Sequence, residues 1–182
     1  MKKILIPFIC ILLALAGCSD NSNSSETPDN VNNFIGEGFK QTLVLLVEAN
    51  RFTVEEAFIE NTLTVDKNDT VKENGKTYYR VISDRFSSAE AIYNYIKAAY
   101  TDEKAEEIIS SGIYADINGK LYCSKNNTKA SESESKQYAI ECISKTEDKC
   151  VFTAKPEKGK KAEMTAILVD GKWKLEDIYT KI

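Results

Sequence analysis

The sequence predicts an α+β fold in which helices and hairpins come first and an antiparallel β-sheet forms the C-terminal third. Two observations predict it. Three turn dipeptides, each followed by lysine and flanked by β-formers, lie at residues 74–75, 118–119 and 170–171, and a strong helical pattern lies between the first two. Because helices are concentrated early and strands late, the pattern differs from an alternating βαβ chain.

Two helical segments are predicted before the first hairpin. Within residues 33–50, apolar side chains recur near helical spacing, at Ile35, Phe39, Leu43, Leu46 and Val47. Gly36 and Gly38 weaken the first turn of this helix. Thr53 followed by Glu56 is a capping-box pattern, which predicts a second short helix.

The central helix is the clearest one. Ser87 with Glu90 forms a capping box, and apolar residues follow at helical spacing, at Ala91, Ile92, Tyr95, Ile96 and Ala99. Thr101 is placed to cap a shorter helix that Gly112 ends.

The turn dipeptides predict three hairpins, because Asn-Gly and Asp-Gly adopt the positive φ angles that tight hairpin turns require. A fourth hairpin is indicated by β-forming runs on either side of residues 145–149. In the last strand, Trp173, Leu175 and Tyr179 alternate with charged residues, which favours a core-facing row over a ligand platform.

The first eighteen residues form a leader. Lys2 and Lys3 precede an apolar run over residues 4–15, which is short for a membrane span and is typical of a signal peptide. The sequence "LALAGC" resembles the bacterial lipobox, and the resemblance implies cleavage before Cys18 and lipid attachment to that cysteine. A plain secretory signal and a single-span anchor are the alternatives. The expected location is the extracytoplasmic face of the cell membrane.

Residues 19–33 are rich in serine and asparagine and are expected to form a flexible tether, followed by one domain at residues 34–182. Without Lys2 and Lys3, 22 basic residues face 28 acidic ones, a formal charge of −6 that disfavours nucleic acid as a partner. The charged segment 125–136 is expected to be either a solvated connector or a contact loop for a protein partner.

Histidine is absent from the whole sequence. This excludes Ser-His and Cys-His nucleophile pairs and histidine-ligated zinc, so no cofactor or metal is predicted. Three cysteines, Cys123, Cys142 and Cys150, follow the leader, which allows at most one internal disulfide. Alternation along two neighbouring strands indicates that Cys142 and Cys150 could lie opposite each other, either as a disulfide or as two packed thiols.

Residues 74–122 carry a family resemblance. The carriers are "GKTYYRVISD", the helix "AEAIYNYIKAAYT", the short helix "EKAEEII" and "NGKLY", and the final strand "GKWKLEDI" fits as well. In order and spacing these resemble the IseA-type inhibitors of bacterial cell-wall D,L-endopeptidases. The resemblance implies an extracytoplasmic protein without catalytic activity, in which a helical lobe and a β lobe flank a cleft. It also implies a protein partner, a cysteine peptidase that cuts peptidoglycan.

Tyr78 and Tyr79 are adjacent, so on a strand they point to opposite faces. One hypothesis places one tyrosine beneath the helix at residues 87–100 and the other in the cleft, with Arg80 or Arg85 nearby as partner-binding residues. The alternative places the second tyrosine on the outer face of an ordinary strand. The expected function is inhibition of a D,L-endopeptidase by covering its active-site groove. Binding of a small molecule or peptide by a lipoprotein of similar shape is the main alternative, and a carboxylate-based hydrolase is a third.

Overall fold

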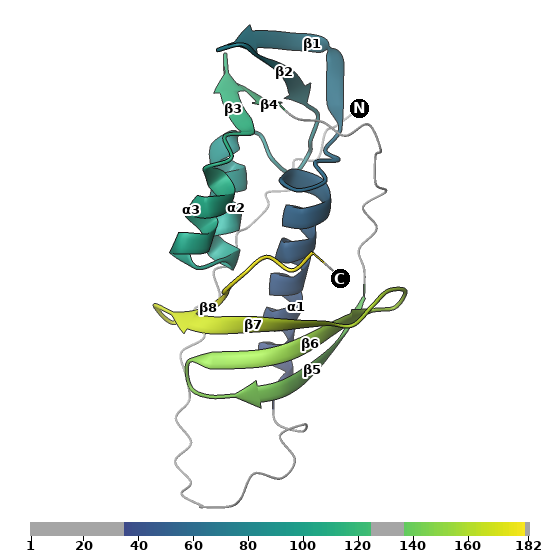
Figure 1. The fold of residues 1–182 in the computed structure, drawn as a ribbon, viewed down its shortest axis with the longest axis vertical. Helices are drawn as coiled ribbons and strands as arrows, with labels where there is room; N and C mark the ends of the chain where they lie inside the picture. Colours follow the sequence, from purple (N-terminus) through teal and green to yellow (C-terminus); the bar gives the residue numbers. More distant parts are fainter. Residues whose placement is uncertain (1–34, 125–136, 181–182) are drawn as a thin grey trace, which may run out of the picture.

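The computed structural model describes residues 35–124 and 137–180 of the chain. Figure 1 shows an elongated molecule with a four-stranded antiparallel sheet towards each end, and α2 and α3 between the two sheets. The elements in chain order are α1 (Glu37–Arg51), the π-helical segment η2 (Phe52–Ala57), β1 (Val65–Glu73), β2 (Lys76–Val81), α2 (Ala89–Ala99), α3 (Asp102–Ile109), β3 (Tyr114–Ile117), β4 (Lys120–Cys123), β5 (Tyr138–Lys145), β6 (Lys149–Pro156), β7 (Ala162–Val169) and β8 (Lys172–Leu175). The predicted α+β class is confirmed.

The first helix is longer than the sequence indicated, because α1 continues into η2 without a break. Arg51 and Phe52 at the junction both have helical backbone angles. The predicted capping box at Thr53 is wrong: the Thr53 hydroxyl is buried and donates to the Ala49 carbonyl at 2.8 Å. Glu56 instead contacts the Arg51 guanidinium at 2.8 Å, so neither residue marks a helix start.

The central helix α2 begins one residue later than predicted. Ser88, and not Ser87, is the N-cap, and its hydroxyl accepts the Ala91 N–H at 3.1 Å. The Asp116 carboxylate on β3 accepts the Ala89 N–H at 2.9 Å, which adds a cap from a distant part of the chain. The predicted Thr101 cap of α3 is confirmed, since its side chain accepts the Lys104 N–H.

All four predicted hairpins are present. Asn74, Asn118 and Asp170 have φ angles of 49°, 51° and 50°, and the glycine after each is also positive, as tight hairpin turns require. The first two hairpins form one sheet in the order β1-β2-β4-β3, here called the first sheet. The last four strands form a meander in the order β5-β6-β7-β8, here called the C-terminal sheet.

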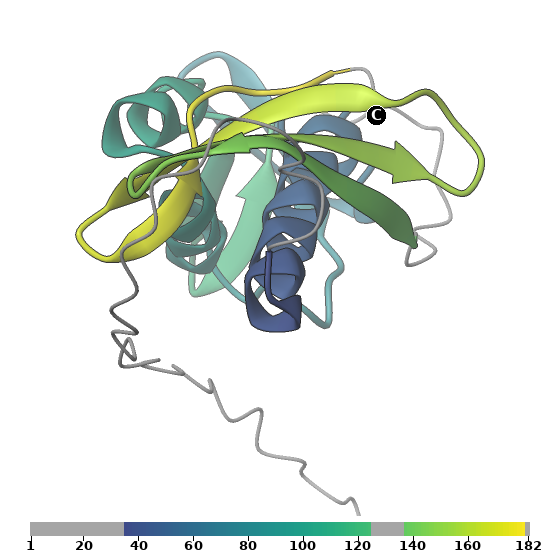
Figure 2. The same ribbon diagram turned by 90° about the horizontal axis from the view of Figure 1, so that it is seen from below.

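The core lies between the helices and the C-terminal sheet. Figure 2 shows α1 lying against one face of this sheet. The largest side chains with no exposed surface come from both layers and include Leu43, Phe52, Ile92, Ile96, Tyr100, Phe152, Met164 and Leu175. Trp173 packs edge to face on Phe39 with ring centroids 4.9 Å apart, and Leu175 is fully buried, so both face the core as predicted. Tyr179 also packs against the core, but it lies after the end of β8 at Leu175 and not on the strand. No helix within the described residues is long and apolar enough to cross a membrane.

The three cysteines in the described part of the chain are buried, and Cys142 and Cys150 are free thiols. Cys142 and Cys150 share the core face of the C-terminal sheet, and their sulfur atoms are 3.9 Å apart. They are not directly opposite, because a bulge near Ser144 sets Cys142 across from Phe152 and Cys150 across from Lys145. Burial and the neighbouring thiol raise the pKa of Cys150 to about 12, so this thiol is protonated at neutral pH.

Candidate functional site

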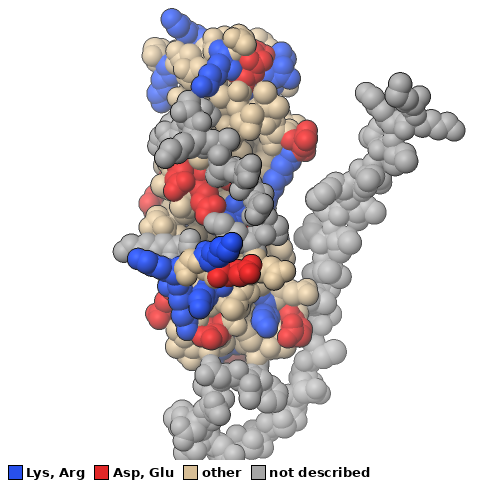
Figure 3. Space-filling view, turned by 90° about the vertical axis from the view of Figure 1, so that its right-hand side faces the viewer, with Lys and Arg blue, Asp and Glu red and all other residues tan. Residues whose placement is uncertain are grey.

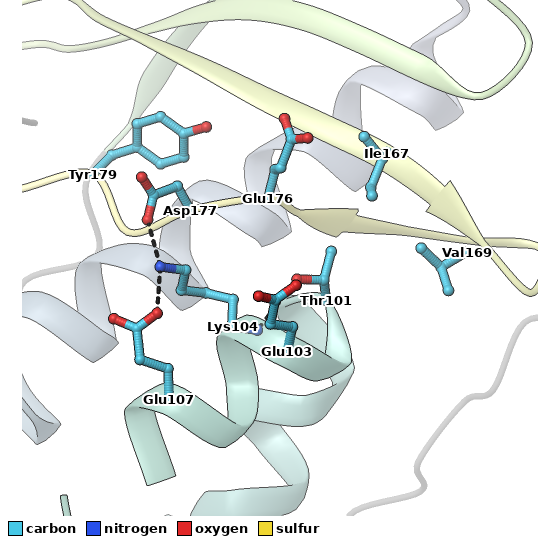
Figure 4. Close-up of a pocket in the computed structure, with 9 residues that line it drawn as sticks. All are labelled: Thr101, Glu103, Lys104, Glu107, Ile167, Val169, Glu176, Asp177 and Tyr179. Carbon is cyan, nitrogen blue, oxygen red and sulfur yellow. Dashed lines mark hydrogen bonds and ion pairs between the residues drawn. The ribbon is translucent and has the colours of Figure 1, made fainter. Parts of the chain in front are cut away.

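A groove of about 660 Å³ separates α3 from the C-terminal sheet and the segment that follows β8. Figure 4 shows that α3 and the preceding Thr101 form one wall, while β7 and residues 176–179 form the other. The residues that line it are Thr101, Glu103, Lys104, Glu107, Ile167, Val169, Glu176, Asp177 and Tyr179. The described structure therefore has a cleft between helical and β layers, as the sequence resemblance implied.

The groove is acidic. Four carboxylates line it, against the single ammonium of Lys104. Lys104 Nζ lies 2.6 Å from Glu107 and 3.0 Å from Asp177, and these hydrogen bonds raise the pKa of Lys104. The bond from Lys104, helped by the Ile178 N–H, lowers the pKa of Asp177, so both groups are charged at neutral pH. The groove therefore keeps a net negative charge.

A second groove of about 520 Å³ continues the first along the C-terminal sheet. The two share Ile167 and Glu176, and Glu176 forms an ion pair of 3.5 Å with Lys149. The first groove is mostly acidic, whereas acidic and basic side chains are mixed over the lower half of the face drawn in Figure 3. The two grooves together offer an extended surface with an aliphatic strip and a charged rim.

The C-terminal wall of the groove is held by one buried amide. The Asn50 side chain donates to the Tyr179 carbonyl at 2.7 Å and accepts the Tyr179 N–H at 2.8 Å. The Tyr100 hydroxyl donates to the same amide oxygen at 3.1 Å, and the Tyr179 hydroxyl accepts the Thr165 N–H at 2.8 Å. Helix α1, the end of α2 and strand β7 therefore fix where residues 176–179 lie.

The arginines predicted as partner contacts lie away from this groove. Arg80 pairs across the strands with Tyr122 and forms an ion pair of 3.5 Å with Asp69. Arg85 lies in the loop before α2, and its guanidinium stacks over a cluster of aromatic rings. Neither belongs to the described residues that line the groove.

The two tyrosines are both half-buried. Tyr79 lies across from Cys123, and alternation places Tyr78 on the opposite face, with Arg80. Neither is among the side chains packed on the described hydrophobic core, and the hypothesis that one of them packs beneath the helix at residues 87–100 stays a prediction. Neither is among the described residues that line the groove, and their role in partner binding stays a prediction.

Sequence reasoning missed the groove residues. The sequence placed Glu103, Lys104 and Glu107 in a short helix and gave them no role in binding. It placed Asn50 at the end of a helical pattern, again without a role. Residues 1–34, with Cys18 and the tether, and the charged segment 125–136 lie outside the described residues.

The lining of the groove is mostly charged, and its carboxylates are exposed. No group of carboxylates and cysteines in the described parts of the chain is arranged to hold a metal ion. Five of the nine lining residues are charged, and Glu103, Glu107, Glu176 and Asp177 are exposed. The groove is therefore open and charged, whereas small-molecule pockets are mostly apolar and enclosed.

The comparisons with known proteins define the family. A family model described as IseA DL-endopeptidase inhibitor matches residues 40–179, from within the first turns of α1 to Tyr179, whose backbone Asn50 holds. The chain therefore belongs to the IseA DL-endopeptidase inhibitor family, which confirms and extends the resemblance found at residues 74–122. The family is one of inhibitors of an endopeptidase and is not itself described as catalytic. A comparison with curated proteins found no match.

Proposed function

We propose that this chain is an extracytoplasmic lipoprotein that binds and inhibits a peptidoglycan D,L-endopeptidase, a cysteine peptidase, by covering the active-site groove of that enzyme. The observation that carries the proposal is the family match over residues 40–179. The chain acts as a ligand of the peptidase and not as an enzyme. The absence of histidine from the whole sequence supports this part, because a Cys-His peptidase mechanism needs one.

The acidic groove between α3 and the C-terminal sheet is the contact surface in this proposal. Its four carboxylates suit a basic region of the target, and its charged lining argues against the alternative of a small-molecule site. The contacts are non-covalent, so inhibition is reversible. The membrane attachment is through lipid on Cys18, supported by the lipobox-like "LALAGC" and the polar residues 19–33.

The test is digestion of purified peptidoglycan by endopeptidases of the same cell, with and without the chain from residue 18 onward carrying Cys18→Ser. We expect the inhibitor to slow at least one such enzyme at micromolar concentration. Glu103→Lys reverses a charge in the groove, and should weaken inhibition roughly tenfold because a contact of favourable sign becomes unfavourable.

The matched control is Glu90→Lys. Glu90 and Glu103 are both exposed second residues of a helix, α2 and α3 respectively, so both changes carry the same charge and the same helix-terminus cost. Glu90→Lys should leave inhibition unchanged. Equal weakening by both variants would remove the groove from the proposal, and no inhibition of any endopeptidase would remove the function.

Membrane attachment has its own measurement. Mass spectrometry of the mature N-terminus should find a diacylglyceryl group on Cys18. An intact Met1, or an unmodified Cys18 after cleavage elsewhere, contradicts the lipoprotein part and leaves the inhibitor part standing.

A further inference from the structure

Arg85 is held over three aromatic rings at the surface of the helical layer. Its guanidinium carbon lies 4.7 Å from the ring centroid of Phe52, 5.0 Å from that of Phe86 and 4.5 Å from that of Tyr95. The three rings also pack on one another, with centroids 5.0 to 5.7 Å apart. They come from η2, from the loop before α2 and from α2 itself, so the cluster is fixed by the fold.

The loop that carries Arg85 is also fixed. The Ser83 hydroxyl accepts the backbone N–H groups of Arg85 and Phe86, each at 3.1 Å. Phe52 has no exposed surface and Phe86 has 7%, whereas Arg85 is exposed. The rings are therefore covered on one side by the guanidinium, and the guanidinium meets solvent on its other side.

The other two arginines form ion pairs with carboxylates, and Arg85 does not form one with any described residue. Arg51 contacts Glu48, Glu55 and Glu56, and Arg80 contacts Asp69. Within the described residues, Arg85 has no carboxylate partner, although it is the arginine whose position is held by three rings. Arg85 also interacts with the side chain of Tyr95. A guanidinium carries five N–H donors in a rigid fork that fits a carboxylate, so Arg85 presents a preorganised cation that no carboxylate of the described residues pairs with.

Apolar side chains are exposed on the same elements. Leu45, which is 69% exposed, lies on α1 about two turns before Phe52, the first residue of η2. Ile82, which is 56% exposed, is three residues before Arg85. An inorganic anion would gain nothing from such neighbours, whereas a peptide can place an aliphatic side chain beside its carboxylate.

We propose that Arg85 is the anchor of a second binding site, which takes the carboxylate of a peptide or protein segment with an aliphatic residue next to it. The site lies apart from the described lining of the acidic groove, and it does not rest on the inhibitory function proposed above. Its ligand has the opposite charge to the one that suits the groove. The carboxylate is either a chain end or an acidic side chain.

The test uses three blocked peptides: N-acetyl-Leu-Ala with a free C-terminus, N-acetyl-Leu-Glu-amide, and N-acetyl-Leu-Gln-amide. Each is titrated to about 20 mM, because a single charge-assisted contact gives millimolar affinity. The protein is the chain from residue 18 with Cys18→Ser, which keeps every described residue. The readout is the NMR signals of the backbone amides of residues 83–86, which every variant keeps, together with the Arg85 side-chain Nε–H in the unaltered chain. We expect saturable shifts with one or both carboxylate peptides and none with the amide peptide.

The variants separate binding from structure. Arg85→Gln should weaken binding roughly 10- to 100-fold, the usual loss when a hydrogen-bonded charge is removed. Arg85→Lys keeps a cation over the rings but loses the fork, and should also weaken binding while the Tyr95 ring signals stay in place. Lys97→Gln removes the same unit charge from an exposed position of α2 and should change nothing.

The two carboxylate peptides distinguish the kinds of carboxylate that Arg85 could bind. Binding of N-acetyl-Leu-Ala alone assigns a chain end, and binding of N-acetyl-Leu-Glu-amide assigns an acidic side chain. Three results overturn the proposal: no saturable shift with either acid, an equal shift with the amide peptide, or equal weakening by Lys97→Gln and Arg85→Gln.

Discussion

Asn50 is a fully buried side chain whose three hydrogen bonds join α1, Tyr100 and the segment after β8. Asn50→Ala leaves the Tyr179 backbone and the Tyr100 hydroxyl without these partners, so we expect a loss of about 3 kcal/mol in the free energy of unfolding. Urea denaturation followed by circular dichroism measures it. Asn94→Ala, at an exposed position of α2, should change stability by about 0.5 kcal/mol or less.

The Asn50 variant also bears on the groove. Tyr179 lines the groove and its backbone is held by Asn50, so Asn50→Ala should weaken inhibition even though Asn50 is not among the described lining residues. Equal stability of the Asn50 and Asn94 variants would show that residues 176–179 are held by other contacts. The sequence could not predict this role. Asn50 ends an apolar helical pattern, and its partner Tyr179 is 129 residues away.

The start of α2 is decided by one hydroxyl. Ser88→Ala removes the bond from the Ala91 N–H and should cost about 1 kcal/mol, the usual value for an N-cap. Ser87→Ala is the control, because Ser87 is exposed and is not the cap residue; it should change stability by less than about 0.5 kcal/mol. Thermal unfolding of the two variants measures the difference. If Ser87→Ala lowered the stability more than Ser88→Ala, Ser87 would be the N-cap, as the sequence pattern indicated.

Local chemistry explains which elements were predictable. Asn74, Asn118 and Asp170 define their hairpins because each turn needs a positive φ angle that few residues adopt. The cap of α2 was off by one residue because Asp116, on β3, accepts the Ala89 N–H and so fixes the first turn from outside the local sequence. At Thr53 the same pattern failed, since burial makes its hydroxyl donate to the preceding turn.

The groove belongs to the whole molecule. Its lining comes from residues 101–107, 167–169 and 176–179, which meet only because the end of α2 bonds to the end of β8. Tyr100 pairs with Leu175 in a parallel bridge, and the Thr101 N–H donates to the Leu175 carbonyl at 3.0 Å. Helical spacing and strand alternation each predict a single element. The sequence therefore predicted the helix and the strand that form the walls of the groove, but not that the two lie side by side.

Charge at this scale should control how fast the inhibitor finds its target. The chain without its leader has 22 basic and 28 acidic residues, and the groove adds a local concentration of carboxylates around Lys104. Long-range attraction to a basic surface speeds encounter, and salt screens it over about 8 Å at physiological ionic strength. The dissociation rate depends on contacts already formed and is screened much less.

We therefore expect the association rate with the target endopeptidase to fall several-fold between about 50 mM and 300 mM salt, while the dissociation rate changes by less than about twofold. Surface plasmon resonance with the endopeptidase immobilised measures both rates. Glu103→Lys should flatten the salt dependence of association, because it removes one attractive charge from the groove and adds a repulsive one. Glu90→Lys changes the net charge of the molecule equally but lies on α2, so it should flatten the dependence less. If both variants flatten it to the same degree, the net charge steers the encounter; if neither does, electrostatic attraction has no part in it.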